Sequence, residues 1–171
     1  MKLAKVTPDG RGLAQVSATD EIVANGQAYA WNSQDLDVDA ANSMITLRND
    51  SPDQDLVVTH AIICAGNANT RYEVHKVTAA YTPATGADGA VIVGVPLNPG
   101  GGIPPVECRS DDEGHSQVAA NVFMEVTLKA VTSIEVQIGM VLGGGEAISV
   151  DQVTESTAGS VIIFGYFVDR Y

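Results

Sequence analysis

The chain has 171 residues, a length that suits one domain with a single core. Hydrophobic residues make up 45% of it and aromatic residues 5%, so the core must consist mainly of Val, Ile, Leu and Ala, which favour packing in sheets. A formal net charge of −12, from 21 acidic and 9 basic residues, makes a phosphate backbone an unfavourable partner, so we expect no binding to nucleic acid.

The N-terminal segment MKLAKVTP has no apolar run of the kind that a secretory signal needs, and no later segment is long and apolar enough to span a bilayer. We therefore expect a soluble protein that is made in a cytoplasm and does not bind membranes. Cys64 lies in an apolar run where a thiol behaves as a small hydrophobe, so we favour free thiols over a disulfide with Cys108.

Short runs that alternate apolar and polar residues, each ended by Gly, Asn, Asp or Pro, repeat along the chain with almost no helical periodicity. The clearest runs are residues 55–65, 118–130, 134–142 and 161–168. The pattern predicts an all-β fold, an antiparallel β-sandwich or jelly roll of roughly eight to ten strands. Residues 1–20 are predicted to form an N-terminal arm, or a frayed terminus with a short edge strand, and residues 21–171 a single sandwich domain.

In chain order, the first predicted hairpin joins residues 21–24 to 27–31 through Asn25 and Gly26. Residues 35–39 alternate acid and aliphatic side chains, so their three aspartates should share one wet face. A strand at 44–48 is followed by a turn at 49–53, whose side chains can bond their own backbone. Consecutive apolar residues within 56–65 suggest a strand covered on both faces, either a central strand or one in a subunit interface.

The second half contains a strand at 71–81, a buried strand at 90–95 that Pro96 stops, and then a segment rich in Pro and Gly. We interpret residues 97–117 as one long exposed loop. Residues 118–130 and 134–142 are predicted to form a second hairpin. A short strand at 147–150 follows the glycines at 143–145, and the apolar run at 160–169 must be a buried final strand.

No group of residues predicts a reaction. His60, Cys64 and His75 could suggest zinc, but residues four apart on a strand are separated by roughly 13 Å, too far to share one ion unaided. The oxygen-rich group at Asn49, Asp50, Asp53 and Asp55 lacks the spaced Gly and final Glu of a calcium loop.

The acidic run at 111–113, beside His115, has no accompanying nucleophile, and Gly100-Gly101-Gly102 is followed by Ile-Pro-Pro, so it is not a phosphate loop. We expect no enzyme, no cofactor and no metal.

Three stretches carry a resemblance: MITLRNDS at 44–51, LVV at 56–58 and GVPLNPGG at 94–101. Together they resemble small structural proteins of tailed-phage virions, over about residues 40–105. The resemblance implies a capsid decoration (cement) protein, a β-sandwich that is often trimeric and sits on the outer capsid surface, bound to the major capsid protein. An acidic domain without a reaction site agrees with such a role.

Under this interpretation residues 1–20 would contact the capsid, and Phe164, Tyr166 and Phe167 would pack within the trimer or in the domain's own core. Trp31, the single tryptophan, would be a core or interface anchor. The main alternative is a receptor- or carbohydrate-binding β-sandwich module of a phage tail fibre or spike, with the loop at 97–117 as its recognition surface.

Overall fold

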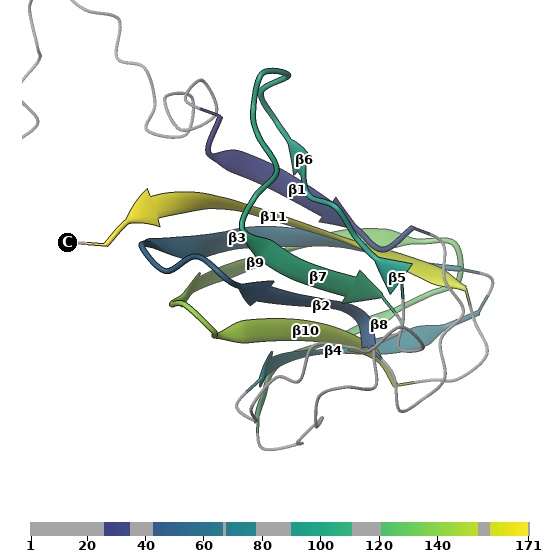
Figure 1. The fold of residues 1–171 in the computed structure, drawn as a ribbon. Coiled ribbons are helices and arrows are strands. Elements are labelled where there is room, and N and C mark those ends of the chain that lie inside the picture. Colours follow the sequence, from purple (N-terminus) through teal and green to yellow (C-terminus); the bar gives the residue numbers. More distant parts are fainter. Residues whose placement is uncertain are drawn as a thin grey trace, which may run out of the picture.

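The computed structural model describes residues 26–34, 43–66, 68–77, 90–110, 121–153 and 158–170. They form two antiparallel sheets that pack face to face as a β-sandwich, which confirms the predicted fold class (Figure 1). The strands are β1 (Ala28–Asn32), β2 (Ser43–Asn49), β3 (Gln54–Ala65), β4 (Thr70–Val77), β5 (Ala90–Val91), β6 (Val95–Pro96), β7 (Val106–Ser110), β8 (Val122–Leu128), β9 (Ser133–Leu142), β10 (Ala147–Gln152) and β11 (Gly159–Asp169).

The five-stranded sheet has the order β6-β1-β11-β3-β9, and the six-stranded sheet has the order β5-β7-β2-β10-β4-β8. Most consecutive strands lie in different sheets, so the chain crosses repeatedly between the layers. The longest pairing joins β3 to β11 from Gly159 opposite Ala65 to Asp169 opposite Gln54. No helix in the described ranges is long and apolar enough to cross a membrane.

The core forms because alternate residues of each strand point between the sheets. Along β11, Val161, Ile163, Gly165 and Phe167 face inward, and the alternate residues Ile162, Phe164 and Tyr166 face outward. Trp31 is fully buried and packs at a tilted angle near Tyr29, with 5.9 Å between ring centroids. The prediction that the apolar final segment is a buried strand is confirmed, because β11 lies between β1 and β3.

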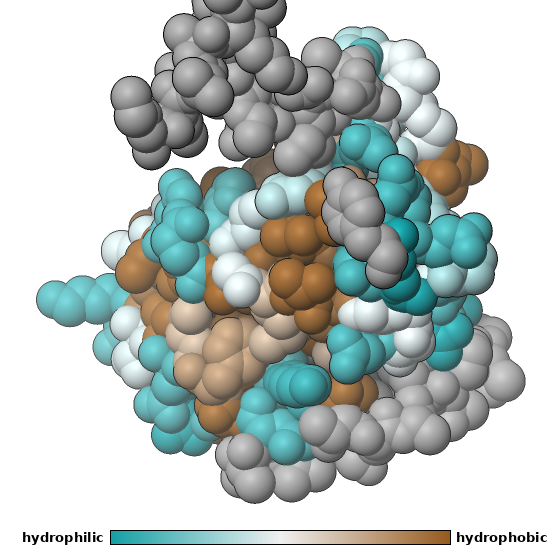
Figure 2. Space-filling view, turned by 90° about the vertical axis from the view of Figure 1, so that its left-hand side faces the viewer, coloured by the Kyte–Doolittle hydropathy of each residue, from teal (hydrophilic) through white to brown (hydrophobic). Residues whose placement is uncertain are grey.

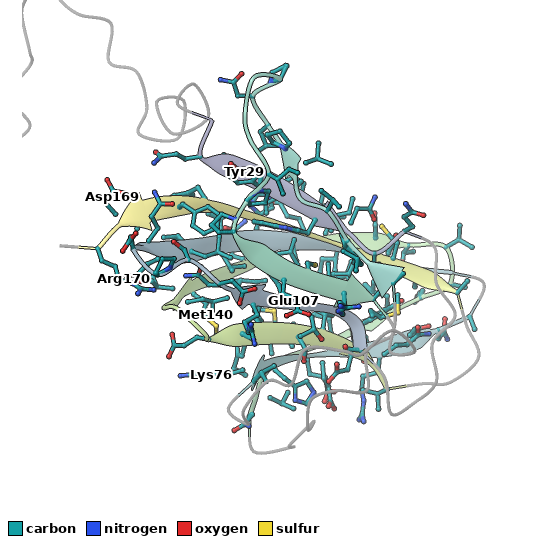
Figure 3. All side chains as sticks on the ribbon, viewed as in Figure 1. Tyr29, Lys76, Glu107, Met140, Asp169 and Arg170 are labelled. Atoms are coloured by element: carbon teal, nitrogen blue, oxygen red, sulfur yellow. The ribbon has the colours of Figure 1, made fainter. Side chains whose placement is uncertain are left out.

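The turn at Asn49–Asp53 also forms as predicted. Asn49 is fully buried, and its amide nitrogen donates to the carbonyls of Gln54 and Leu142, each at 2.9 Å. Its amide oxygen accepts the Ser51 N–H at 2.9 Å. Arg170 holds the same turn from the end of β11, since its guanidinium donates to the Pro52 carbonyl at 2.9 Å and pairs with Asp55 (Figure 3).

The predicted second hairpin is wrong. β8 pairs with β4 in one sheet, and β9 pairs with β3 in the other, so the turn between them joins the two layers. The alternation of both strands was correctly predicted, but alternation cannot show which partner a strand bonds. Core-facing side chains of both strands pack against the same core from opposite sheets.

The predicted buried strand at 90–95 is also wrong. β5 bonds β7 and β6 bonds β1, so residues 92–94 cross from one sheet to the other, and Val91 and Val95 are 65% and 62% exposed. The predicted exposed loop at 97–117 needs a related correction. Its residues Val106–Ser110 form β7, with Cys108 buried, because they alternate inward and outward beside β2.

Several predictions concern residues outside the described ranges: the arm at 1–20, the first strand of the hairpin at 21–24, the aspartates at 35–39, and the acidic run at 111–113 with His115. Gly26, at the turn of that hairpin, has a φ of +72°. The strand that follows is bonded by β11 along its whole length and by β6 at Tyr29 and Ala30.

Candidate functional site

The outward surface of the five-stranded sheet is apolar along its middle. We call it the apolar face; it consists of Ala30, Val57, Ile62, Val141, Ile162, Phe164, Tyr166 and Val168. The strand registers place these side chains in rows: Val141, Val57 and Tyr166 lie side by side in one row, and Ile62 and Ile162 in another. The exposed face of an antiparallel sheet is ordinarily polar.

The strands produce this surface because β3 and β11 carry apolar residues at both alternating sets of positions. Val57, Ile62 and Ile162 are half-buried against their neighbours, and Val141 on the edge strand is 55% exposed. The registers place Val141, Val57 and Tyr166 at neighbouring positions, so these apolar side chains are adjacent and not a scatter of single residues. Figure 2 views the molecule along the strands, from the end at which β11 finishes, and apolar side chains also gather at this end of the sandwich.

His60 is held within the apolar face. Its ring stacks on Phe164, with 4.5 Å between centroids and 9° between planes. The Thr59 hydroxyl donates to the Phe164 carbonyl at 3.1 Å and lies 2.9 Å from His60 Nδ1. Because a hydroxyl has a single hydrogen, Nδ1–H must be the donor to Thr59, which fixes the orientation of the ring.

The outward surface of the six-stranded sheet carries a buried group of polar side chains. We call it the polar cluster: Glu73 and His75 from β4, with Ser149 and Asp151 from β10. His75 Nε2 lies 2.7 Å from Asp151 Oδ2 and 3.4 Å from Glu73 Oε2. His75 and Asp151 are 4% and 2% exposed.

The electrostatics of the polar cluster are unusual. The pKa of Asp151 is raised from 3.8 to about 7, mainly by burial; the Ser149 hydroxyl acts to lower this pKa, and the charge of Glu73 acts to raise it. Although the contacts are short, neither ring nitrogen of His75 and neither oxygen of Asp151 forms a hydrogen bond of ordinary geometry with the described residues. Burying polar atoms without hydrogen-bond partners costs free energy, so the polar cluster lowers the stability of the fold.

Both ring nitrogens of His75 and both carboxylate oxygens of Asp151 are buried, so the polar cluster presents none of these atoms to a substrate at the surface. Within the described ranges, no three His, Cys, Asp or Glu side chains are placed to hold a metal ion.

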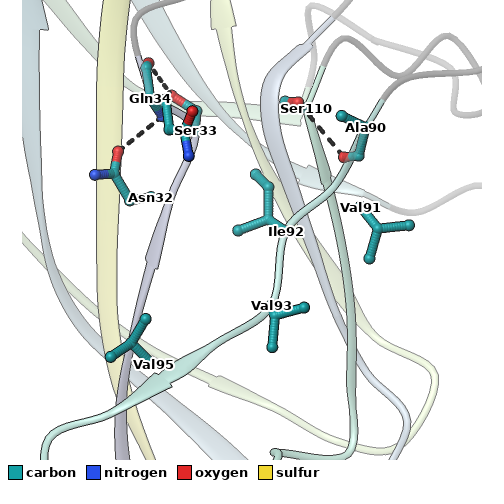
Figure 4. A pocket seen from close by; sticks show the side chains of 9 residues that line it. All are labelled: Asn32, Ser33, Gln34, Ala90, Val91, Ile92, Val93, Val95 and Ser110. Carbon is teal, nitrogen blue, oxygen red and sulfur yellow. Dashed lines mark hydrogen bonds between the residues drawn. The ribbon is translucent and has the colours of Figure 1, made fainter.

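A pocket of about 460 Å³ lies at the edge of the sandwich where residues 92–94 cross between the sheets (Figure 4). It is lined by Asn32, Ser33, Gln34, Ala90, Val91, Ile92, Val93, Val95 and Ser110. Local hydrogen bonds occupy several of its polar groups: Gln34 N–H donates to Asn32 Oδ1 at 2.8 Å, and the Ser33 hydroxyl donates to the Gln34 carbonyl at 3.1 Å. The lining has neither the aromatic platform nor the charged group on which a sugar or anion site usually depends.

The residues predicted as interface anchors divide between the core and the surface. Trp31 and Phe167 lie in the domain's own core, which was one of the two predicted locations. Phe164 and Tyr166 lie half-buried on the apolar face, so the interface role of these two remains a prediction. His60 and His75 lie on the outward surfaces of opposite sheets. They therefore cannot bind one zinc ion together, as the sequence had suggested they could.

Comparison with known proteins finds no matching family model, no similar curated protein and no similar solved structure. Sequence reasoning missed the polar cluster, because its members are 76 residues apart along the chain and no short motif contains them. The sequence did predict that the strand at 56–65, which contributes Val57 and Ile62 to the apolar face, is covered on both faces.

Proposed function

We propose that this protein is a structural protein of a phage virion, a capsid decoration protein that binds the outside of the shell and associates with copies of itself, most simply as a trimer. The observation that carries the proposal is the apolar face. Because the sheet already buries its inner face in the domain core, a second apolar face needs a partner outside the domain. The resemblance of residues 40–105 to virion proteins supports a capsid as the larger particle.

The apolar face suits protein association better than ligand binding. Its central rows are nearly uncharged: Asp55 at one end is paired with Arg170, and Glu135 lies beside Ile62 on the edge strand. Removing a large apolar side chain fully from water contributes roughly 1.5–3 kcal/mol. Even part of that contribution from each of the seven large side chains of the apolar face is enough to drive association of a protein with a net charge of −12.

Such a protein would act by mass action. A ligand that binds only the assembled shell adds its binding free energy to shell stability, about 2.7 kcal/mol at a free concentration of 100 times Kd. This role needs no catalytic group. The expected partner is the major capsid protein, at the outer capsid surface.

The test compares wild type with Ile162→Thr on the apolar face and with Ile103→Thr as a matched control. Ile103 is 83% exposed and lies outside the apolar face, and the two substitutions make the same chemical change. We expect wild type and Ile103→Thr to form the same oligomer in light scattering and to co-sediment with expanded capsids near one copy per site. Ile162→Thr should dissociate and lose at least tenfold in capsid affinity, with an unchanged circular dichroism spectrum.

Monomeric wild type at tens of micromolar that does not co-sediment with capsids would contradict the proposal. Binding to host cells or glycans, with few copies per virion by gel densitometry, would instead establish the alternative of a tail-fibre or spike module.

A further inference from the structure

The polar cluster is placed where two strands pair, so any change in its charge acts on that pairing. Asp151 lies opposite Glu73 in the β10–β4 register, and Ser149 lies opposite His75. Register shifts next to the cluster, at Val150/Asp151 towards β2 and at Val74/His75 towards β8, interrupt the regular ladders on both sides. The β10–β4 ladder itself runs without a shift from Ala147 to Gln152, so the polar cluster lies on one regular ladder between two interrupted ones.

Among the residues that the structure describes, the charged neighbours of the cluster leave it with an excess of negative charge. On β4, Arg71 lies 3.4 Å from Glu73 Oε1, but it is also shared with Glu125 of β8 at 3.9 Å, and its side chain is 45% exposed. On β2, Arg48 pairs with Asp50 at 2.6 Å and lies near Glu107 of β7. Arg109 of β7 also pairs with Glu107, at 3.0 Å. Two buried or half-buried carboxylates therefore face one imidazole.

We propose that the polar cluster is a proton-operated switch: one proton on Asp151, beside His75 and Glu73, keeps β10 packed on β4, and its loss weakens this part of the sheet. Asp151 and Glu73 both lie against the His75 ring, at 2.7 Å and 3.4 Å from Nε2, in a site that is almost closed to water. A second buried negative charge at this place is unfavourable, whereas a proton on Asp151 removes one unit of negative charge. The inference does not depend on the proposed function.

The direction of the effect follows from linkage. The raised pKa of Asp151, about 7, means that between pH 4 and 7 this carboxyl holds a proton in the folded protein that it lacks in the unfolded chain. Raising the pH through this window therefore lowers the contribution of Asp151 to stability, by about tenfold in the unfolding equilibrium constant per pH unit, and the ratio of wild type to Asp151→Asn isolates this contribution. Below the window both states hold the proton and above it neither does, so this contribution to the slope disappears.

The experiment is denaturant unfolding between pH 5 and 8 of wild type, Asp151→Asn and the control Asp53→Asn, which removes an exposed carboxylate. Asn is neutral at every pH and keeps the size of Asp. We expect the ratio of the unfolding constants of wild type and Asp151→Asn to rise about tenfold per pH unit up to pH 7 and then to level off. The same ratio for Asp53→Asn should change less than twofold.

A titration of the carboxyl ¹³C resonances of the wild-type protein decides the question even if Asp151→Asn does not fold. The proposal requires the Asp151 resonance to titrate near pH 7. An Asp151 resonance that titrates near pH 4, or parallel pH curves for wild type and a folded Asp151→Asn, would overturn it.

Discussion

Asn49 shows how one side chain can hold several segments of this fold together. Its amide nitrogen bonds the start of β3 and the end of β9, and its amide oxygen bonds Ser51 in the turn. The Asn49 backbone contributes two more bonds, donating to the Glu146 carbonyl at 3.0 Å and accepting the Gly145 N–H at 2.7 Å. The residue therefore joins the β2–β3 turn to the Gly143–Gly145 turn.

We expect Asn49→Ala to lower the free energy of unfolding by about 2–4 kcal/mol, because three hydrogen bonds are lost, two of them buried, and two carbonyls lose a donor. Asn32→Ala is the control: the Asn32 amide oxygen also accepts an N–H two residues later, but the side chain is exposed. Its cost should stay below about 1 kcal/mol. Urea denaturation measures both, and equal costs would show that the Asn49 network adds nothing.

At the scale of elements, the segment from β5 to β6 closes one edge of the sandwich. Gly94 sits where this segment passes over Trp31, and a Cβ there would lie 2.5 Å from Trp31 Nε1 and 2.7 Å from a carbon of Pro104. A glycine is thus required here, because the backbone at Gly94 lies too close to Trp31 and Pro104 for any side chain. It allows the chain to leave one sheet and join the other while Trp31 stays buried.

Gly94→Ala should destabilise the protein by about 1–3 kcal/mol, since the added methyl group overpacks the site. Because Trp31 is the single tryptophan, its emission should also shift to longer wavelength as the segment moves away. Gly102→Ala is the matched control, with no atom within 4 Å of the added carbon. Thermal unfolding measures the loss of stability, and fluorescence measures the emission shift. Identical behaviour of both variants would show that the segment can move to accommodate the added methyl group.

At the scale of the whole molecule, two forces oppose each other. The net charge of −12 makes copies of the chain repel, whereas the apolar face favours contact. Salt screens the first force and leaves the second, since the Debye length falls from about 30 Å at 10 mM to about 3 Å at 1 M.

We therefore expect the association constant of the wild-type protein to rise with added sodium chloride, at least tenfold between about 10 mM and 1 M. Sedimentation equilibrium measures it, and Ile162→Thr should remain dissociated at both concentrations. Association that weakens with salt would mean that ion pairs, and not the apolar face, hold the copies together.

Local patterns in the sequence predicted much of the fold. Alternation identified β3, β8, β9 and β11, and the polar turn at 49–53 was correct down to its side-chain bonds to the backbone. β7 was missed because its five residues lie between a Pro- and Gly-rich segment and an acidic run, so that composition outweighed a short period-two signal. The parts of the apolar face on β3 and β11 could be recognised in the sequence as apolar runs. The polar cluster could not be recognised, because it joins residues from β4 and β10 that share no short motif.

The sequence by itself determined that this chain forms strands, how each strand divides its side chains between two faces, and how acidic the molecule is, because these depend only on local periodicity and composition. The tertiary structure alone decided which strands pair, that β8 and β9 belong to opposite sheets, and that Glu73, His75 and Asp151 meet. The physical reason is that pairing is chosen by competition among distant strands for one shared core, and this competition has no local sequence signature.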